Sequence, residues 1–262
     1  MATRATRKKH YTHSGKGQSG RHPIRIVPLH SAARLAPATT PHLSYRNGPL
    51  LTNAEVYCIY WGEAWQSAAN AKISQQLDGF FDFILTSPLL DQLGEYSMPG
   101  KTIGHGSRTG SRTVTSSEPG ASIEDSAIQD FVRGNLASGN FPASDANSLY
   151  FVFLPPGTQV TQQGAASCRD FCGYHDATTE GVYYAVMPYA GCAGCLGGLS
   201  AVDALTSTSS HELCEAITDP MPGQGWYDDA NGEIGDICAW RTKKIGDFTV
   251  QLEWSNAAGA CV

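Results

Sequence analysis

Residues 209–220, with the sequence SSHELCEAITDP, decide how the rest of the chain is interpreted. As a helix, this stretch places His211 and Glu215 one turn apart on the same face, where both can reach a single metal ion. In zinc peptidases, a His-Glu-x-x-His helix supplies two ligands and a Glu that activates water. Here Glu215 replaces the second histidine, and zinc accepts such mixed nitrogen and oxygen ligands. The motif therefore predicts His211 and Glu215 as zinc ligands and Glu212 as the catalytic base.

The competing interpretation of this motif is a solvated helix face that carries one His and two Glu. Apolar residues recur at helix-like intervals in and before the motif: Val202, Leu205, Leu213 and Ile217. They give the helix an opposite face to bury. Pro220 ends the helix soon after Glu215, because proline has no N–H to donate and restricts the residue before it. The polar face is therefore expected to end at a turn that a substrate can approach.

A catalytic zinc usually keeps three protein ligands and one water molecule, so the motif needs a third ligand. The glycine-rich residues 225–238 contain four carboxylates, of which Asp236 is the preferred ligand and Glu233 an alternate. A rival interpretation of this segment is a calcium loop, because Asp229, Asn231 and Glu233 offer hard oxygen ligands at alternate positions. The segment lacks the full EF-hand spacing. Zinc is therefore the predicted cofactor and calcium the alternative.

Charge is unevenly distributed along the 262 residues. Half of the 18 Lys and Arg residues fall within residues 1–46, which contain no Asp or Glu. Residues 1–45 also lack a sustained hydrophobic period, and they predict a basic, disordered leader or pro-segment. Its basic side chains include Arg4, Arg7, Lys8 and Lys9. No aromatic residues are interleaved with them, so a solvated tail is expected and no nucleic-acid partner is predicted.

Residues 46–262 are expected to form one catalytic domain. Strand patterns occupy residues 56–61, 148–154, 182–187 and 248–254. Residues 65–86 form an amphipathic helix pattern, and residues 97–121 predict a loop or irregular hairpin. This order predicts an α/β fold: a single zincin-like domain with a mixed β-sheet flanked by helices, including the active-site helix. No apolar run approaches the ~20 residues of a membrane helix, so no membrane contact is expected. The protein is also expected to be a monomer.

The eight cysteines admit two interpretations. Four of them form two short-spaced pairs: Cys168 with Cys172, and Cys192 with Cys195. Such pairs are typical of four-thiolate zinc sites. The alternative is disulfide bonding in an exported protein, which the even count and the low charge content favour. Cys238 and Cys261 are then the first expected pair, tying the end of the chain to the carboxylate-rich segment.

Residues 168–175 (CRDFCGYH), residues 192–195 (CAGC), the Asp219-Pro220 pair after the helix and the final Cys238…Cys261 together resemble the EXORDIUM (phosphate-induced protein) family. That family is best known from plant cell walls. The likeness extends over about residues 50–262 and implies a secreted, extracellular protein. Plant members lack an intact His-Glu-x-x-Glu, so the resemblance implies a microbial branch whose fold keeps a metallopeptidase-like site.

In light of this resemblance, His175 is an alternate third metal ligand, because histidine is the commonest nitrogen donor; the competing role is a loop histidine bonded to backbone. The predicted function is a secreted zinc metallopeptidase that acts on proteins or peptides, with Tyr227 as a donor to the oxyanion. The alternative is a non-catalytic cell-wall or carbohydrate-binding protein with a structural cation. Its expected stacking surface is aromatic: Trp226, Tyr227, Tyr183 and Tyr184.

Overall fold

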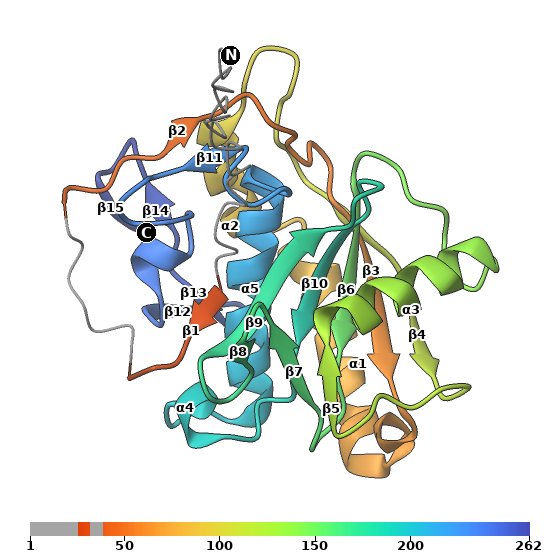
Figure 1. Ribbon diagram of the computed structural model, residues 1–262. Helices are drawn as coiled ribbons and strands as arrows, with labels where there is room; N and C mark the ends of the chain where they lie inside the picture. Colours follow the sequence, from red (N-terminus) through yellow and green to blue (C-terminus); the bar gives the residue numbers. More distant parts are fainter. Residues whose placement is uncertain (1–25, 32–38) are drawn as a thin grey trace, which may run out of the picture.

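A six-stranded sheet forms the centre of this computed structural model, which describes residues 26–31 and 39–262. Its strand order is β1-β9-β10-β6-β3-β4 (Figure 1). The strands are β1 (Ile26–Pro28), β3 (Glu55–Trp61), β4 (Ser107–Val114), β6 (Ser148–Phe153), β9 (Phe171–Ala177) and β10 (Tyr183–Met187). Strands β4, β3, β6 and β10 run parallel, whereas β9 is antiparallel to β10 and β1 is antiparallel to β9. The predicted mixed sheet is therefore confirmed.

Strand β6 lies in the middle of this sheet, and all six of its residues are buried. Parallel strands covered on both faces have continuous apolar sequences, which is why this strand is recognisable from sequence. On one face, Phe151 and Phe153 join the core formed with helices α1 and α5. On the other, Tyr150 and Val152 pack with helix α3. The sheet is thus the middle of three layers.

Five helices and three 3-10 turns are present in the described part of the chain. The helices are α1 (Ala68–Ile84), α2 (Pro88–Leu93), α3 (Asp125–Ala137), α4 (Ala193–Leu196) and α5 (Ala201–Thr218). The 3-10 turns are η1 (Glu63–Gln66), η2 (Gly94–Tyr96) and η3 (Asp236–Cys238). Helix α1 begins later than residue 65 because the Ser67 hydroxyl accepts the Asn70 N–H as an N-cap. Ser200 caps α5 in the same way.

Small sheets complete the fold around α5. They are β2 (Ser44–Tyr45) with β11 (Trp226–Tyr227), β5 (Ser122–Glu124) with β7 (Gln159–Gln162) and β8 (Ala165–Ala166), β12 (Thr242–Ile245) with β13 (Phe248–Gln251), and β14 (Trp254–Ser255) with β15 (Ala260–Cys261). The β12–β13 hairpin packs directly on α5, where the Thr206 hydroxyl donates to the Thr249 carbonyl at 2.8 Å. Helix α5 consequently lies between the main sheet and this hairpin.

Burial of α5 differs from the prediction. Every residue from Ala204 to Thr218 is buried, whereas the sequence predicts a polar face that ends at a turn open to a substrate. The β12–β13 hairpin and the segment after Asp219 cover the polar side, and the N–H of Gln251 donates to the Ser210 hydroxyl at 2.9 Å. The polar face of the motif therefore faces protein instead of an open turn.

Two strands of the main sheet occupy segments that the sequence predicts as loops. Strand β4 lies within residues 97–121, and β9 carries His175. Strand β4 is an edge strand whose residues are mostly exposed, so it needs no apolar face and gives no alternating signal. The polar residues of β9 are covered by α5, which the local sequence does not reveal.

Parts of the predicted leader belong to the folded domain. Val27 is buried and pairs with Gly173, and the ring of His30 stacks on Trp240 with centroids 3.6 Å apart. Leu43 is also fully buried. The predicted domain boundary at residue 46 is therefore wrong for residues 26–31 and 39–45. The remaining leader residues lie outside the described part of the chain: Arg4, Arg7, Lys8 and Lys9 are among them.

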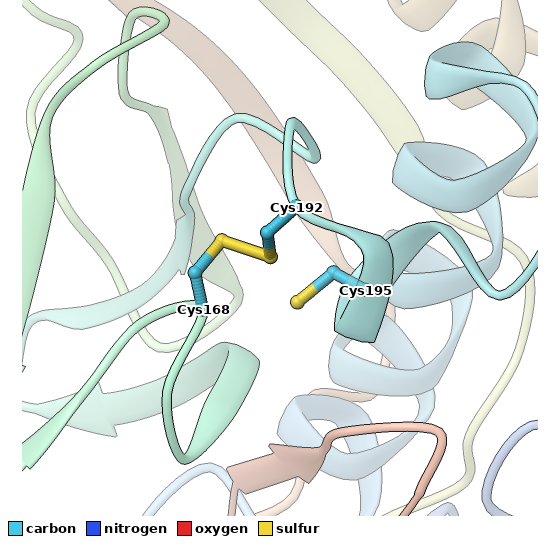
Figure 2. A group of neighbouring side chains, drawn as sticks. All are labelled: Cys168, Cys192 and Cys195. Atoms are coloured by element: carbon cyan, nitrogen blue, oxygen red, sulfur yellow. A yellow bond between two sulfur atoms is a disulfide. The ribbon is translucent and has the colours of Figure 1, made fainter.

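Three disulfides confirm the predicted disulfide framework: Cys168–Cys192, Cys172–Cys195 and Cys238–Cys261. Figure 2 shows the first of these bonds with the Cys195 sulfur beside it. All four sulfurs of the alternative zinc site are engaged in disulfides, so the four-thiolate interpretation is not supported. Cys58 and Cys214 are free and buried. No helix within the described ranges is both long and apolar enough to cross a bilayer.

Thiol titration tests this cysteine assignment. We expect two reactive thiols in the denatured, unreduced protein, from Cys58 and Cys214, and none in the native protein because both are fully buried. Prior reduction should raise the count to eight and lower the midpoint of thermal unfolding, since native bridges in exported domains contribute ~2–5 kcal/mol. Eight thiols without reduction would contradict the framework.

Candidate metal centre

Helix α5 presents His211 and Glu215 to the same point, as the motif spacing predicts. Nε2 of His211 lies 2.9 Å from Oε1 of Glu215. The approach suits charge attraction but lacks hydrogen-bond alignment, and both nitrogens of His211 are buried without a hydrogen-bond partner. Because this nitrogen and this oxygen are close together but do not hydrogen-bond each other, both can direct a lone pair at one shared cation.

Asp236 joins these two residues from the turn η3. The backbone N–H of Asp236 donates to Oε1 of Glu215 at 3.1 Å. One ligand atom from each of His211, Glu215 and Asp236 can be chosen so that all lie within 4.8 Å of one another. Asp236 is half-buried, whereas the other two are fully buried. The structure thus brings the three predicted ligands together, with Asp236 on the side nearest to solvent.

Two glycines allow the η3 segment to approach α5 this closely. A Cβ on Gly235 would lie 2.8 Å from Cγ and Nδ1 of His211, so a side chain at this position would collide with the imidazole. Gly232 has a φ of +94°, which L-residues with a side chain rarely adopt. These two glycines therefore let the segment fold back against helix α5, where a residue with a side chain would clash or be strained.

His175 approaches the same cluster from strand β9. Its Nδ1 lies 3.0 Å from Oε2 of Glu212, and its Nε2 lies 3.1 Å from the carbonyl oxygen of Asp219. A carbonyl can only accept, so Nε2 carries a hydrogen, and a second proton is shared between Nδ1 and the carboxylate. Burial lowers the pKa of His175, but the hydrogen bond that its ring donates to Glu212 and the charges of Glu212 and Glu215 outweigh burial and raise the pKa to about 9.

The engaged nitrogens of His175 decide between the two sets of possible ligands. His175, Glu212 and Glu215 also have ligand atoms within 4.8 Å of one another. Both nitrogens of His175, however, already have hydrogen-bond partners, whereas those of His211 have none. The set with His211 and Asp236 is therefore better suited to a cation, and His175 is better placed to hold Glu212.

Glu212 is held at one oxygen only. Its Oε2 is hydrogen-bonded to His175, while Oε1 is buried without a partner. A Cβ on Gly173 would lie 3.4 Å from that Oε1, so β9 packs directly against the carboxylate. Burial raises the pKa of Glu212, and the hydrogen bond to His175 opposes this rise.

Glu233, the alternate ligand, also turns into the cluster. It is fully buried, its Oε1 lies 3.6 Å from Nε2 of His175, and both of its carboxylate oxygens lack a hydrogen-bond partner. Burial, followed by the charges of Glu215, Asp219 and Asp236, raises its pKa well above the ordinary value. Among the described residues, the ion pairs of Glu212, Glu215 and Glu233 are with histidines only. The cluster is therefore crowded with buried carboxyl groups, whose ionised forms a cation would stabilise.

The residues of the predicted calcium loop do not converge. Asp229 pairs with Arg46 at an exposed position. The side chain of Asn231 donates to the Asp228 carboxylate at 3.2 Å, and Glu233 turns inward. The alternating oxygens thus serve different partners, because the segment folds as a turn around the Asp228 side chain.

Tyr227 lies in the short β2–β11 ladder. It pairs with Ser44, and the Arg46 guanidinium lies over its ring at 4.4 Å from the centroid. Its predicted contribution to an oxyanion site stays a prediction. Glu253, in contrast, is a fully buried carboxylate near this cluster that the motif analysis did not identify. Its isolated charge in the otherwise strand-like segment 248–254 is the signal that could have identified it.

Comparison with known proteins supports the resemblance inferred from sequence. The chain is 26% identical over 257 residues to Protein EXORDIUM-like 5 of Arabidopsis thaliana, covering 82% of this chain and 69% of that protein. It is therefore a distant relative of an EXORDIUM-like protein over most of its length. No protein-family model matches the chain. No solved structure matches it either. The three disulfides are consistent with a secreted protein.

Substituting Gly235 tests how closely the η3 segment packs on His211. We expect Gly235→Ala to lower the free energy of unfolding by about 1–3 kcal/mol, because the added Cβ must displace a buried imidazole or the turn itself. Gly79→Ala is the matched control: this glycine lies within α1 with nothing inside 4 Å of its would-be Cβ, so the change should stabilise by up to about 1 kcal/mol. Equal effects of the two changes in denaturant unfolding would contradict the described packing.

Proposed function

We propose that this chain is a secreted zinc metallopeptidase with a zincin-like domain. Its ligands are His211, Glu215 and Asp236, and Glu212 is the general base. The observation that carries the proposal is the convergence of these three side chains within 4.8 Å, beside a carboxylate with one free oxygen. The distant EXORDIUM-like relative supports the extracellular setting but not the activity.

Zinc fits the chemistry of the donor set. One imidazole nitrogen and two carboxylates form a mixed nitrogen and oxygen site of the kind that catalytic zinc uses. An all-oxygen site would favour calcium instead. The two ligand carboxylates carry a charge of −2, so the site attracts divalent ions strongly but selects against harder ions less well than a three-histidine site.

Glu212 and His175 supply the acid–base part of the proposed mechanism. When bound, zinc would polarise a water molecule and the scissile carbonyl. Glu212 can accept a proton at Oε1, because Oε2 is fixed by Nδ1 of His175. His175 is itself anchored at Nε2 by the Asp219 carbonyl. This hydrogen-bonded chain orients Glu212 and prepares it to pass the proton on to the leaving amine.

Complete burial of the cluster favours a second candidate function, that of a non-catalytic protein with a structural cation. His211, Glu212 and Glu215 have no exposed surface. Two cavities of about 330 and 430 Å³ lie elsewhere, beside Lys244 and Tyr189 respectively. A peptidase would have to open the side near Asp236 to admit a substrate.

The carbohydrate-binding version of this second candidate has less support. Of the aromatic side chains expected to stack on sugars, Tyr184 is fully buried and donates to Asp125 at 2.8 Å. Tyr227 is buried as well. Trp226 is half-buried, and its indole N–H donates to the Tyr96 carbonyl. These rings serve internal packing, so a structural cation is the stronger part of the alternative.

Ligand substitutions test the metal centre. We expect Asp236→Ala and His211→Ala each to lower zinc affinity by an order of magnitude or more, because each removes a ligand. His175→Ala should retain the metal, since both nitrogens of His175 serve hydrogen bonds. A competition titration against a zinc chelator measures all three variants. Loss of zinc in His175→Ala with retention in Asp236→Ala would show that the other set of side chains binds the ion.

The base is tested by Glu212→Gln, which preserves the size of the side chain. We expect metal content close to that of the unmodified protein and a fall of at least ~100-fold in hydrolysis of a denatured protein substrate, the scale of losing a positioned general base. Glu180→Gln, at an exposed position, is the control and should leave activity unchanged. Zinc bound at one equivalent without hydrolysis by the unmodified protein would favour the structural cation.

A further inference from the structure

Two disulfides meet beside helix α4, and they differ in their access to solvent. In the first, Cys168 is exposed and Cys192 is half-buried, so we call Cys168–Cys192 the surface bond. In the second, Cys172 and Cys195 are both buried, so we call Cys172–Cys195 the buried bond. The two cysteines of the Cys-x-x-Cys sequence at 192–195 thus belong to different bonds, and neither bond takes part in the proposed metal centre.

The sulfur of Cys195, in the buried bond, lies next to the surface bond. The sulfurs of Cys168, Cys192 and Cys195 all lie within 4.8 Å of one another (Figure 2). The backbone holds Cys192 and Cys195 one turn apart, because the Cys195 N–H donates to the Cys192 carbonyl at 3.0 Å. Disulfides exchange when a thiolate attacks a disulfide sulfur. A thiolate formed at Cys192 would therefore have a disulfide sulfur, that of Cys195, beside it.

A cavity of about 430 Å³ lies against the surface bond, and both Cys168 and Cys192 line it. Thr158, Gln159 and Tyr189 are also in its walls. The described residues that line this cavity include no Asp, Glu, Lys, Arg or His. Ligand pockets from ~300 Å³ upward hold small organic molecules. The cavity therefore suits a small, uncharged molecule, and a thiol bound there would lie against a disulfide.

The third disulfide lacks these features. Cys238 is fully buried and Cys261 is half-buried. Within residues 26–31 and 39–262, the only cluster of three cysteine sulfurs is the one around the surface bond. Exposed disulfides are more easily reduced than buried structural ones. The surface bond is therefore the expected first target of an external thiol.

We infer that the surface bond is the entry point of a two-disulfide exchange site, which oxidises an uncharged small-molecule thiol bound in the cavity and passes the electrons to the buried bond. The inference rests on the four sulfurs and the cavity, and it does not depend on the proposed metal centre or on peptidase activity. Its consequence is a new pairing of the four cysteines, in which Cys192 and Cys195 are bonded to each other.

Three exchange steps complete the reaction. The bound thiolate attacks the exposed sulfur of Cys168, forms a mixed disulfide there and breaks the surface bond, whose electron pair stays on Cys192. The Cys192 thiolate then attacks Cys195, so a Cys192–Cys195 bond forms and Cys172 leaves with the electron pair of the buried bond. A second small thiol attacks the first one in the mixed disulfide, which releases their disulfide and frees Cys168. The two small thiols lose two electrons and two protons, which remain on Cys168 and Cys172 as thiols.

The test exposes the native, full-length protein to the methyl ester of N-acetylcysteine, an uncharged thiol. Acid stops the reaction, free thiols are blocked with a maleimide under denaturing conditions, and peptide mass mapping locates thiols and bonds. We expect a mixed disulfide on Cys168 first. We then expect thiols at Cys168 and Cys172 together with a Cys192–Cys195 bond. The Cys238–Cys261 bond is the internal control and should stay intact throughout this stage.

Two further variants separate access from transfer. Thr158→Trp should fill the cavity and slow formation of the mixed disulfide by at least ~10-fold, because exchange depends on access to the attacked sulfur. Thr179→Trp, at an exposed position outside the cavity, is its control and should react like the unmodified protein. Removing the buried bond by Cys172→Ala together with Cys195→Ala should leave the new thiols at Cys168 and Cys192.

Any of three results would overturn the inference. Reduction of the Cys238–Cys261 bond as fast as the surface bond would show that the surface bond is not a preferred site. New thiols at Cys168 and Cys192 in the unmodified protein, with the buried bond intact, would exclude transfer between the two bonds. Equal rates for Thr158→Trp and its control would exclude the cavity as the site of the thiol.

Discussion

The burial of several carboxylates around two histidines is the constraint on which the structure depends. Glu212, Glu215, Glu233 and Glu253 are all fully buried, and Asp236 completes the group at its edge. Like charges in a medium of low polarity repel strongly, and each is also unfavourably desolvated. Among the described residues, His175 and His211 are the only ion-pair partners of Glu212, Glu215 and Glu233. A divalent cation would satisfy this arrangement directly.

The fold holds these residues together against their mutual repulsion. Helix α5 is packed between the main sheet and the β12–β13 hairpin, so its polar face cannot turn to solvent. The disulfides brace the segments that meet on this face. Cys172–Cys195 ties β9, which carries His175, to helix α4, and Cys238–Cys261 ties η3 to β15. Covalent links therefore fix the loops that deliver Asp236 and Glu253.

Catalysis and structural metal binding make different demands on this same cluster. A structural cation needs closed coordination and no solvent, which agrees with the complete burial of His211, Glu212 and Glu215. A peptidase needs a base with a free oxygen and a route for substrate, and Glu212 meets the first demand. Asp236, half-buried in η3, marks where such a route would open. In the proposed peptidase, the hydrogen-bonded chain from Asp219 through His175 to Glu212 would orient the base.

The sequence by itself determined those features that depend on residues close together in the chain. The helical period sets His211 and Glu215 on one face, and the apolar runs of β3, β6 and β10 identify strands buried on both sides. The carboxylates of the glycine-rich segment after the helix predict Asp236 as the third ligand. The structure places Asp236 beside His211 and Glu215. Only the tertiary structure made strands of β4 and β9, buried the polar face of α5, paired His175 with Glu212 and placed Glu253 beside them. These contacts join residues far apart in the chain, 37 positions in the case of His175 and Glu212. These contacts are stabilised by packing and charge between distant segments. The hydrophobic periodicity of a single segment therefore cannot predict them.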